Sequence, residues 1–270
     1  MTQHASSDLP REATDAPTPA DPAQLHVTGS GAPLIFVPGL DGTGLLFYRQ
    51  TRHLMHRFRI ITFRLRDDAP DMATLVADLV RHLDRVVPDG APVVMVGESF
   101  GGALAMSFAA AHPERVRELV ILNSFTRITP RAKLFLALAA MRLVPWGTMQ
   151  WVRRLTAWRL HSAHTHREEI DRFLLLTRGT TRDGYRNRLR ILTRYDIRPA
   201  LPQLRMPTLY LAADEDHLIA SVQEARVMAA RVPGATLRIL RGHGHCAFLA
   251  PDIDLDQLLH EWASTRSDTP

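Results

Sequence analysis

Short apolar runs alternate with segments of helical spacing along most of this chain. Runs rich in β-branched and other apolar residues, typical of strands buried on both faces, occupy residues 34–37, 58–65, 93–96, 118–122, 208–213 and 236–240. Helical patterns end near residue 57 and cover residues 74–87, 101–112, 222–232 and 255–262. In one of them Leu75, Leu79 and Leu83 form a single apolar stripe. The alternation predicts an α/β fold with a doubly wound, mostly parallel sheet.

Two parts of the chain depart from this alternation. Residues 127–205 are helical in pattern and contain no strand candidate, so we expect a helical lid inserted into a core formed by residues 25–126 and 206–266. Residues 1–24 contain four prolines and few bulky apolar side chains, which predicts a disordered tail without the features of a secretory signal.

The predicted lid differs from the core in charge. It carries 17 Lys and Arg against 5 Asp and Glu, whereas the rest of the chain carries 16 against 23, so the formal net charge of +5 conceals a basic lid on an acidic body. Trp151, Leu155 and Trp158 share a helix face there. That face either packs the lid onto the core, or meets an acyl chain or an anionic lipid surface together with Arg153, Arg154 and Arg159.

The strongest chemical signal is the segment Val-Val-Met-Val-Gly-Glu-Ser-Phe-Gly-Gly at residues 93–102. A buried strand runs into Gly-x-Ser-x-Gly and a helical pattern begins at once, which is the order that a strained nucleophile turn requires. Ser99 then lies at the tip, and side chains at Gly97 or Gly101 would collide with neighbouring backbone. The sequence therefore predicts Ser99 as a nucleophile.

Partners for a catalytic serine follow later strands. The strand at 208–213 precedes an acidic turn with Asp214 and Asp216, and the strand at 236–240 precedes His243 and His245. A serine nucleophile needs an imidazole to accept its proton and a carboxylate to orient that imidazole. The chain order is therefore serine, acid, histidine, with two candidates for each of the last two roles.

These motifs resemble those of the α/β-hydrolase superfamily over about residues 25–262. The resemblance implies that Asp216, three positions after the small residue Ala213, is the acid, and that the Gly-His pair ending at His245 supplies the base. Ala213 departs from the family, which usually has Gly there. His243 is then a loop histidine that hydrogen-bonds locally or faces water.

An oxyanion hole would need two backbone amides. The residue after the nucleophile, Phe100, supplies one. By position in the resemblance, Leu40 supplies the other, from the glycine-rich loop Pro-Gly-Leu-Asp-Gly-Thr-Gly at residues 38–44, where many family members have His-Gly in place of Pro-Gly. The loop lacks the Lys-Ser or Lys-Thr of a phosphate-binding loop, and it is similar to one in a branch of plastid phytyl-ester synthases and related lipid acyltransferases.

The resemblance implies a serine hydrolase that cleaves an ester or thioester with an apolar acyl part through an acyl-enzyme. An acyltransferase that passes a fatty acyl group to a lipid alcohol is the alternative, and a non-catalytic binding protein is a third hypothesis. No cofactor is needed for acyl transfer through Ser99. The expected partners are a small acyl ester or thioester and, through the basic lid, anionic lipid or an acyl carrier; no nucleic-acid-binding module is recognisable.

The remaining reactive side chains receive plainer interpretations. The single cysteine, Cys246, excludes an internal disulfide, suits the reducing cytoplasm, and is interpreted as a small packing residue; the basic lid adds a peripheral membrane location as a hypothesis. His161, His164 and His166 lack a matching carboxylate or cysteine pattern nearby in the sequence, so we interpret them as solvated lid histidines and expect no metal site.

Overall fold

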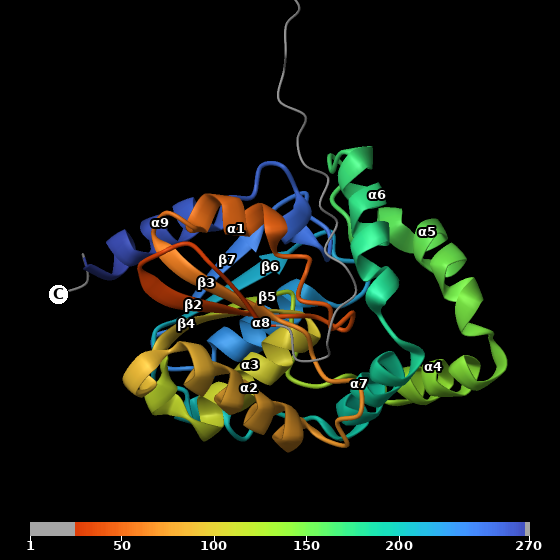
Figure 1. Cartoon of the computed structure of the whole chain (residues 1–270), viewed down its shortest axis with the longest axis horizontal. Helices are drawn as coiled ribbons and strands as arrows, with labels where there is room; N and C mark the ends of the chain where they lie inside the picture. Colours follow the sequence, from red (N-terminus) through yellow and green to blue (C-terminus); the bar gives the residue numbers. More distant parts are fainter. Residues whose placement is uncertain (1–24, 268–270) are drawn as a thin grey trace, which may run out of the picture.

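The computed structural model describes residues 25–267 of the 270-residue chain, except for the side chains of Asp89, Lys133, Met149, Gln150 and Arg153. The predicted tail at residues 1–24 lies outside the described residues. Within them, strands and helices alternate as expected around one sheet, and a helical insertion follows the fifth strand (Figure 1).

The sheet has seven strands in the order β1-β3-β2-β4-β5-β6-β7, all parallel except β1. β6 and β7 coincide with the predicted runs, whereas β3 is shorter and β5 begins earlier. β1 was not predicted, because it is a four-residue edge strand with three exposed residues and no apolar run. The bounds are β1 Leu25–Thr28, β2 Ala32–Val37, β3 Phe58–Phe63, β4 Val93–Glu98, β5 Val116–Leu122, β6 Thr208–Ala213 and β7 Thr236–Leu240.

Helices cover both faces of the sheet (Figure 1). Helices α1 (Tyr48–Leu54) and α9 (Leu255–Ser267) pack on one face, and α2 (Met72–Val86), α3 (Phe100–Ala111) and α8 (Ser221–Ala229) on the other. Alternate strand residues supply the two cores: Phe36 packs with α1 and α9, whereas its neighbour Ile35 packs with α2 and α3. The predicted doubly wound sheet is therefore confirmed.

Helix α2 shows how local sequence sets an element's start. It begins two residues before the predicted position because Asp71 adopts an extended conformation and its carboxylate accepts a hydrogen bond from the backbone N–H of Thr74. The predicted stripe of Leu75, Leu79 and Leu83 is buried against the sheet.

The insertion between β5 and β6 contains only helices and turns among its described residues. These are α4 (Ala132–Leu143), α5 (Met149–Leu160), α6 (Arg167–Leu176) and α7 (Arg182–Arg194), and they lie beyond one end of the sheet with α5 outermost (Figure 1).

Single 3₁₀ turns occur in both the core and the insertion, at Pro88–Gly90, Pro113–Arg115, Trp146–Thr148, Thr177–Gly179, Leu201–Gln203 and Ala247–Leu249.

Of the two alternatives for the helix face in the insertion, the structure contradicts one. Trp151, Leu155 and Trp158 were expected either to pack onto the core or to meet acyl chains or lipid. Their exposed fractions are 62%, 72% and 65%, so they do not pack onto the core. Helix α5 follows the outer edge of the insertion. Ala157 of the same helix is buried, in contrast to these three side chains.

Candidate active site

Ser99 lies at a sharp turn between β4 and α3. Its φ of 57° and ψ of −120° fall outside the regions that non-glycine residues favour, a strain of about 1–3 kcal/mol that surrounding contacts must maintain. A Cβ on Gly101 would lie 2.0 Å from the carbonyl oxygen of Val37, and one on Gly97 would lie 2.6 Å from that of Gly101. The predicted need for glycine at both positions is therefore confirmed.

Asp216 and His245 form a buried hydrogen-bonded pair. Asp216 follows β6, His245 follows β7, and His245 Nδ1 lies 2.7 Å from Asp216 Oδ2, with the two side chains 7% and 1% exposed for histidine and aspartate. Asp216 Oδ1 also accepts hydrogen bonds from the backbone N–H groups of Leu218 and Ile219. These bonds fix the carboxylate, which in turn fixes the imidazole.

The pair also sets its own protonation. Burial by itself would raise the pKa of Asp216, but the hydrogen bond and charge of His245 outweigh burial and lower that pKa. Burial by itself would lower the pKa of His245, but the hydrogen bond and charge of Asp216 outweigh it and raise that pKa. Asp216 is thus held as a carboxylate that stabilises an imidazolium on His245.

The alternative acid and base lie elsewhere. The exposed Asp214 accepts a hydrogen bond from the backbone N–H of Gly242 at 2.7 Å. His243 Nδ1 lies 2.7 Å from the carbonyl oxygen of Arg241, which agrees with the predicted local hydrogen bond, although the ring is buried. Neither residue contacts the pair formed by Asp216 and His245 through a hydrogen bond among the described residues.

Asn123 and Ser124, at the end of β5, connect the loops that carry these groups. The Asn123 amide donates to the carbonyl oxygen of His245 at 2.8 Å and accepts from the N–H of Ala213 at 2.8 Å. The Ser124 hydroxyl donates to the carbonyl oxygen of Ser99 at 2.8 Å. Sequence reasoning missed both residues, although two polar residues directly after a buried strand were the available signal.

Within the described residues Ser99 Oγ and His245 Nε2 are not hydrogen-bonded to each other. Their backbones are held side by side through Asn123 and Ser124, and in free enzymes such a bond often closes only when substrate is present. The arrangement therefore brings the nucleophile and base candidates to one edge of the sheet.

The loop with Leu40 runs beside the serine. A Cβ on Gly39 would lie 3.6 Å from the carbonyl oxygen of Glu98 and 4.0 Å from Ser99 Cβ. Among the described residues, the backbone N–H groups of Leu40 and Phe100 donate no hydrogen bond within the protein. Two free amides next to one serine can bind the oxygen of a developing oxyanion.

Arg188, on α7 of the insertion, holds this loop. It is 1% exposed, and its guanidinium donates to the carbonyl oxygen of Leu40 at 3.0 Å and to that of Asp41 at 3.3 Å. Burial lowers the pKa of Arg188. Sequence reasoning counted it only among the lid cations, but its place on one helical stripe between Gly184 and Leu192, both buried, was a detectable signal.

The insertion also contacts the histidine loop. The N–H of Cys246 donates to the carbonyl oxygen of Leu160 at 2.7 Å, and burial raises the pKa of the Cys246 thiol well above its ordinary value, which agrees with a packing role. His161 was expected to be solvated, and this is wrong: its ring is buried edge-on against Phe173, and Nδ1 lies 2.8 Å from the carbonyl oxygen of Ala157.

Glu98 is a buried carboxyl beside the nucleophile. Burial raises its pKa from 4.5 to about 8, although the charge of His245 opposes this shift, and its Oε1 has no hydrogen-bond partner among the described residues. Glu98 is therefore mostly neutral at pH 7, and the candidate site carries one carboxylate fewer than its composition suggests.

We expect Glu98→Gln to change how stability depends on pH. As pH rises, Glu98 ionises first in the unfolded chain, so its contribution to stability is complete below about pH 4.5 and is lost as pH rises toward 8. Relative to wild type, the variant should gain unfolding free energy between pH 5 and 8 and no more above that. Urea unfolding at pH 5, 7 and 9 measures this. The same change at Glu168, which is exposed on α6, is the control, and a constant difference for Glu98→Gln would contradict the prediction.

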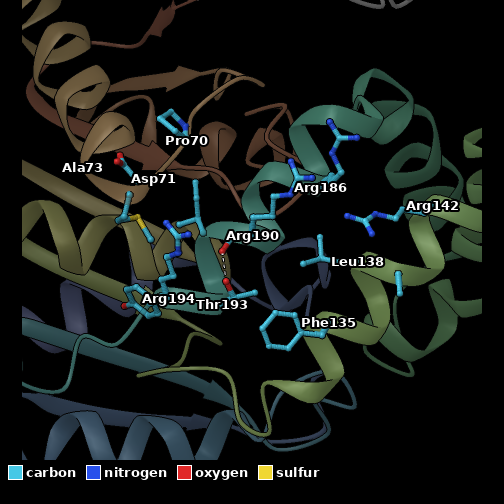
Figure 2. A pocket seen from close by; sticks show the side chains of 14 residues that line it. Pro70, Asp71, Ala73, Phe135, Leu138, Arg142, Arg186, Arg190, Thr193 and Arg194 are labelled. Atoms are coloured by element: carbon cyan, nitrogen blue, oxygen red, sulfur yellow. Dashed lines mark hydrogen bonds between the residues drawn. The ribbon is translucent and has the colours of Figure 1, made fainter.

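A cavity of about 670 Å³ lies between the start of α2, α4 and α7 (Figure 2). Arg186, Arg190 and Arg194, one helical turn apart on α7, face it together with Phe135 and Leu138 of α4. Arg188 lies on the other side of α7, since it is two residues from Arg186 and Arg190. None of the five candidate catalytic and oxyanion residues lines this cavity, so it is separate from the candidate site.

Comparisons with known proteins agree with this arrangement. A family model described as "Alpha/beta hydrolase family" matches residues 34–253. A protein named carbamate hydrolase RutD, from Caulobacter sp., is 28% identical over 225 residues, which are 78% of this chain and 83% of that protein.

Two further matches differ in what they cover. A thermophilic esterase from Thermogutta terrifontis has a similar fold, with a TM-score of 0.78 and 22% identity over 90% of this chain and 93% of the esterase. Polyketide synthase ThaQ of Burkholderia thailandensis is 30% identical over 240 residues, 84% of this chain but only 11% of that longer protein.

Proposed function

Since the chain belongs to the alpha/beta hydrolase family and is a hydrolase of that type, we propose that it is a serine hydrolase that cleaves a carboxylic ester or thioester with an apolar acyl part. The observation that carries the proposal is the buried hydrogen bond between Asp216 and His245 at the same sheet edge as the strained Ser99. A protein that only binds ligands would have no need of this combination of strain and buried charge.

In the proposed mechanism Ser99 Oγ attacks the carbonyl carbon and its proton passes to His245 Nε2. Asp216 stabilises the imidazolium, and the amides of Leu40 and Phe100 bind the oxyanion. His245 then gives the proton to the leaving alcohol or thiol as the bond to it breaks. Water, deprotonated by His245, attacks the acyl-enzyme, and the acid is released as the bond to Ser99 breaks and His245 returns the proton to Ser99 Oγ.

The second candidate reaction differs only in the acceptor. If a lipid alcohol took the place of water, the same residues would form a new ester, as the similarity of residues 38–44 to lipid acyltransferases implies. Arg188 supports either outcome, because it fixes the carbonyl groups of Leu40 and Asp41 and leaves the Leu40 amide free for the oxyanion.

A fluorophosphonate probe and a substrate panel test the proposal. The wild-type chain should be labelled once, and its kcat/KM should rise with acyl length across p-nitrophenyl esters and acyl thioesters. Failure of labelling would favour a binding protein. A preference for acetyl esters, or for a small carbamate as in the name of the RutD relative, would overturn the apolar acyl part. Ester formation on adding a long-chain alcohol would identify the acyltransferase.

The insertion presents an apolar and basic outer face. Seven of its large apolar side chains are exposed on or beside α4 and α5 and do not line the cavity: Leu136, Leu143, Val144, Trp151, Val152, Leu155 and Trp158. Residues 127–167 contain eight Lys and Arg and no Asp or Glu. No helix among the described residues is long and apolar enough to span a bilayer.

This combination favours an anionic lipid surface as the occupant of the face. Aromatic side chains with flanking arginines bind at the boundary between head groups and acyl chains, where exposed apolar area is buried and cations meet anionic groups. The Arg159 guanidinium lies 5.3 Å from the ring centre of Trp158, so one charge and one aromatic ring are already adjacent. We propose that the enzyme acts at such a surface.

We expect replacement of Arg154 and Arg159 with Gln to weaken binding to vesicles of anionic phospholipid at least tenfold, as should raising the salt to about 0.5 M, where charges are screened within a few ångströms. Cosedimentation measures binding, and turnover of a short neutral ester should barely change. Arg231→Gln, an exposed change on the core, is the control. Equal binding to zwitterionic vesicles, binding to an acidic acyl carrier protein only, or self-association detected by light scattering would contradict the proposal.

A further inference from the structure

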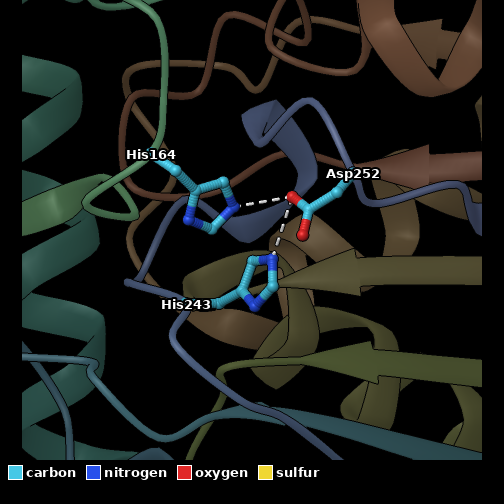
Figure 3. A group of neighbouring side chains, drawn as sticks. All are labelled: His164, His243 and Asp252. Atoms are coloured by element: carbon cyan, nitrogen blue, oxygen red, sulfur yellow. Dashed lines mark hydrogen bonds and ion pairs between the residues drawn. The ribbon is translucent and has the colours of Figure 1, made fainter.

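A second cluster of polar side chains includes His243, two residues before His245 in the sequence (Figure 3). His164 belongs to the turn between α5 and α6, His243 to the loop after β7, and Asp252 to the segment before α9. Asp252 Oδ1 lies 2.7 Å from His164 Nε2 and 3.2 Å from His243 Nε2. The proposed reaction uses none of these three groups.

The hydrogen bond at Nδ1 of His243 leaves the other ring nitrogen, Nε2, facing Asp252. Its Nδ1 lies 2.7 Å from the carbonyl oxygen of Arg241, which can only accept, so Nδ1 carries a proton. In a neutral ring Nε2 would then be a lone pair facing Asp252 Oδ1, which is also an acceptor. A metal ion bound by both atoms would make this contact favourable.

The surroundings of His243 match those of a metal-binding histidine. Histidines that bind metals commonly donate their other ring N–H to a backbone carbonyl, as His243 does to Arg241, because this bond fixes the tautomer and the ring orientation. The ring is also buried, so its position is restricted before any ion binds. His164 and Asp252, in contrast, are partly exposed and leave one side open to water.

The donor set and its spacing suit zinc. Asp252 Oδ1 lies 2.7 Å and 3.2 Å from the two imidazole nitrogens, and one ligand atom from each residue lies within 4.8 Å of the others, whereas neighbouring ligands of a tetrahedral zinc ion are about 3.4 Å apart. Two imidazoles and one carboxylate, with water as the fourth ligand, are typical of Zn²⁺ and unlike the oxygen sets that Ca²⁺ and Mg²⁺ prefer. Small side-chain rotations would bring all three groups onto one ion.

We propose that His164, His243 and Asp252 bind Zn²⁺ or a similar divalent transition-metal ion. Such an ion would join the insertion, through His164, to the core, through Asp252 and the loop that also carries His245. Its role would be to fix the insertion against the catalytic loop. The alternative is a set of direct contacts between the two imidazoles and Asp252 without an ion, and this alternative predicts no metal affinity.

Calorimetric titration of the full chain with ZnCl₂ after chelator treatment tests the proposal. We expect one ion per chain, with binding weakened at least tenfold in His164→Ala and in Asp252→Asn. His53→Ala is the matched control, because His53 Nδ1 also meets an aspartate, Asp254 Oδ2 at 3.1 Å, but belongs to no three-ligand group among the described residues. His245→Ala should bind zinc as wild type does, which separates this site from the proposed active site.

Two further measurements distinguish loss of zinc binding from loss of stability in a variant. Bound Co²⁺ should give visible absorption bands in wild type that disappear in Asp252→Asn, and zinc should raise the melting temperature of wild type and His53→Ala but not of His164→Ala. Absence of saturable zinc binding to the wild-type chain would overturn the proposal. So would equal zinc binding by His164→Ala, Asp252→Asn and the control His53→Ala. Neither result depends on whether Ser99 is a nucleophile.

Discussion

Replacement of Ser99 with alanine is expected to abolish fluorophosphonate labelling and to lower kcat by about 10⁶-fold, because loss of a serine nucleophile removes the covalent route. KM should change little, since the acyl part would be bound by the rest of the site. Active-site labelling and turnover of the best substrate from the panel measure both effects.

Ser107 provides a matched control for this change. It lies on α3, the helix that begins directly after Ser99, is half-buried, and its hydroxyl donates to the carbonyl oxygen of Ala103 at 2.9 Å. Ser107→Ala should therefore keep labelling and turnover. Alanine tolerates the left-handed backbone at position 99 no worse than serine, so the melting temperature of Ser99→Ala should match wild type. Labelling that persists in Ser99→Ala would show that another residue is the nucleophile.

The second large effect is expected at Asp216. Asp216→Asn should lower kcat by about 10⁴-fold, because an amide favours the wrong tautomer of His245 and cannot stabilise an imidazolium. It should also lower the pKa of His245, since the hydrogen bond and charge of Asp216 raise that pKa. The acidic limb of the residual pH–rate profile should then move to lower pH, which a purely structural role for Asp216 would not produce.

Asp214→Asn is the matched control for the acid. An asparagine keeps an oxygen that can accept from the Gly242 N–H, so activity should stay within about tenfold of wild type. For the base, His245→Ala should be severely impaired, whereas His243→Ala, assayed with a chelator so that bound metal does not contribute, should stay within about tenfold. The reverse ranking in either pair would show that the acid or base had been assigned to the wrong turn.

Features set by neighbours close in the sequence were predicted correctly, whereas features set by packing between distant elements were not. β6 and β7 lie where their apolar runs predicted: β6 is buried at every position, and β7, although only partly buried, keeps an apolar majority in Leu237, Ile239 and Leu240. The turn at Ser99 was also predicted correctly. Its glycines are required because a Cβ at either position would collide with backbone atoms a few residues away or in one neighbouring strand. In contrast, the sequence left open whether Trp151 packs onto the core, and the burial of His161 was predicted wrongly, because local spacing shows which residues share a face but not what that face meets.

Local sequence was enough to predict the order of the strands from β2 to β7, the position of the strained serine, and the contrast in charge between the insertion and the core. Each of these depends on composition or on neighbours within about one turn or strand. The contact of Arg188 with Leu40, 148 residues away, and that of His164 with Asp252, 88 residues away, became visible only in the folded structure. Such contacts are fixed by how whole elements pack, and packing places side chains together without leaving a local pattern in the sequence.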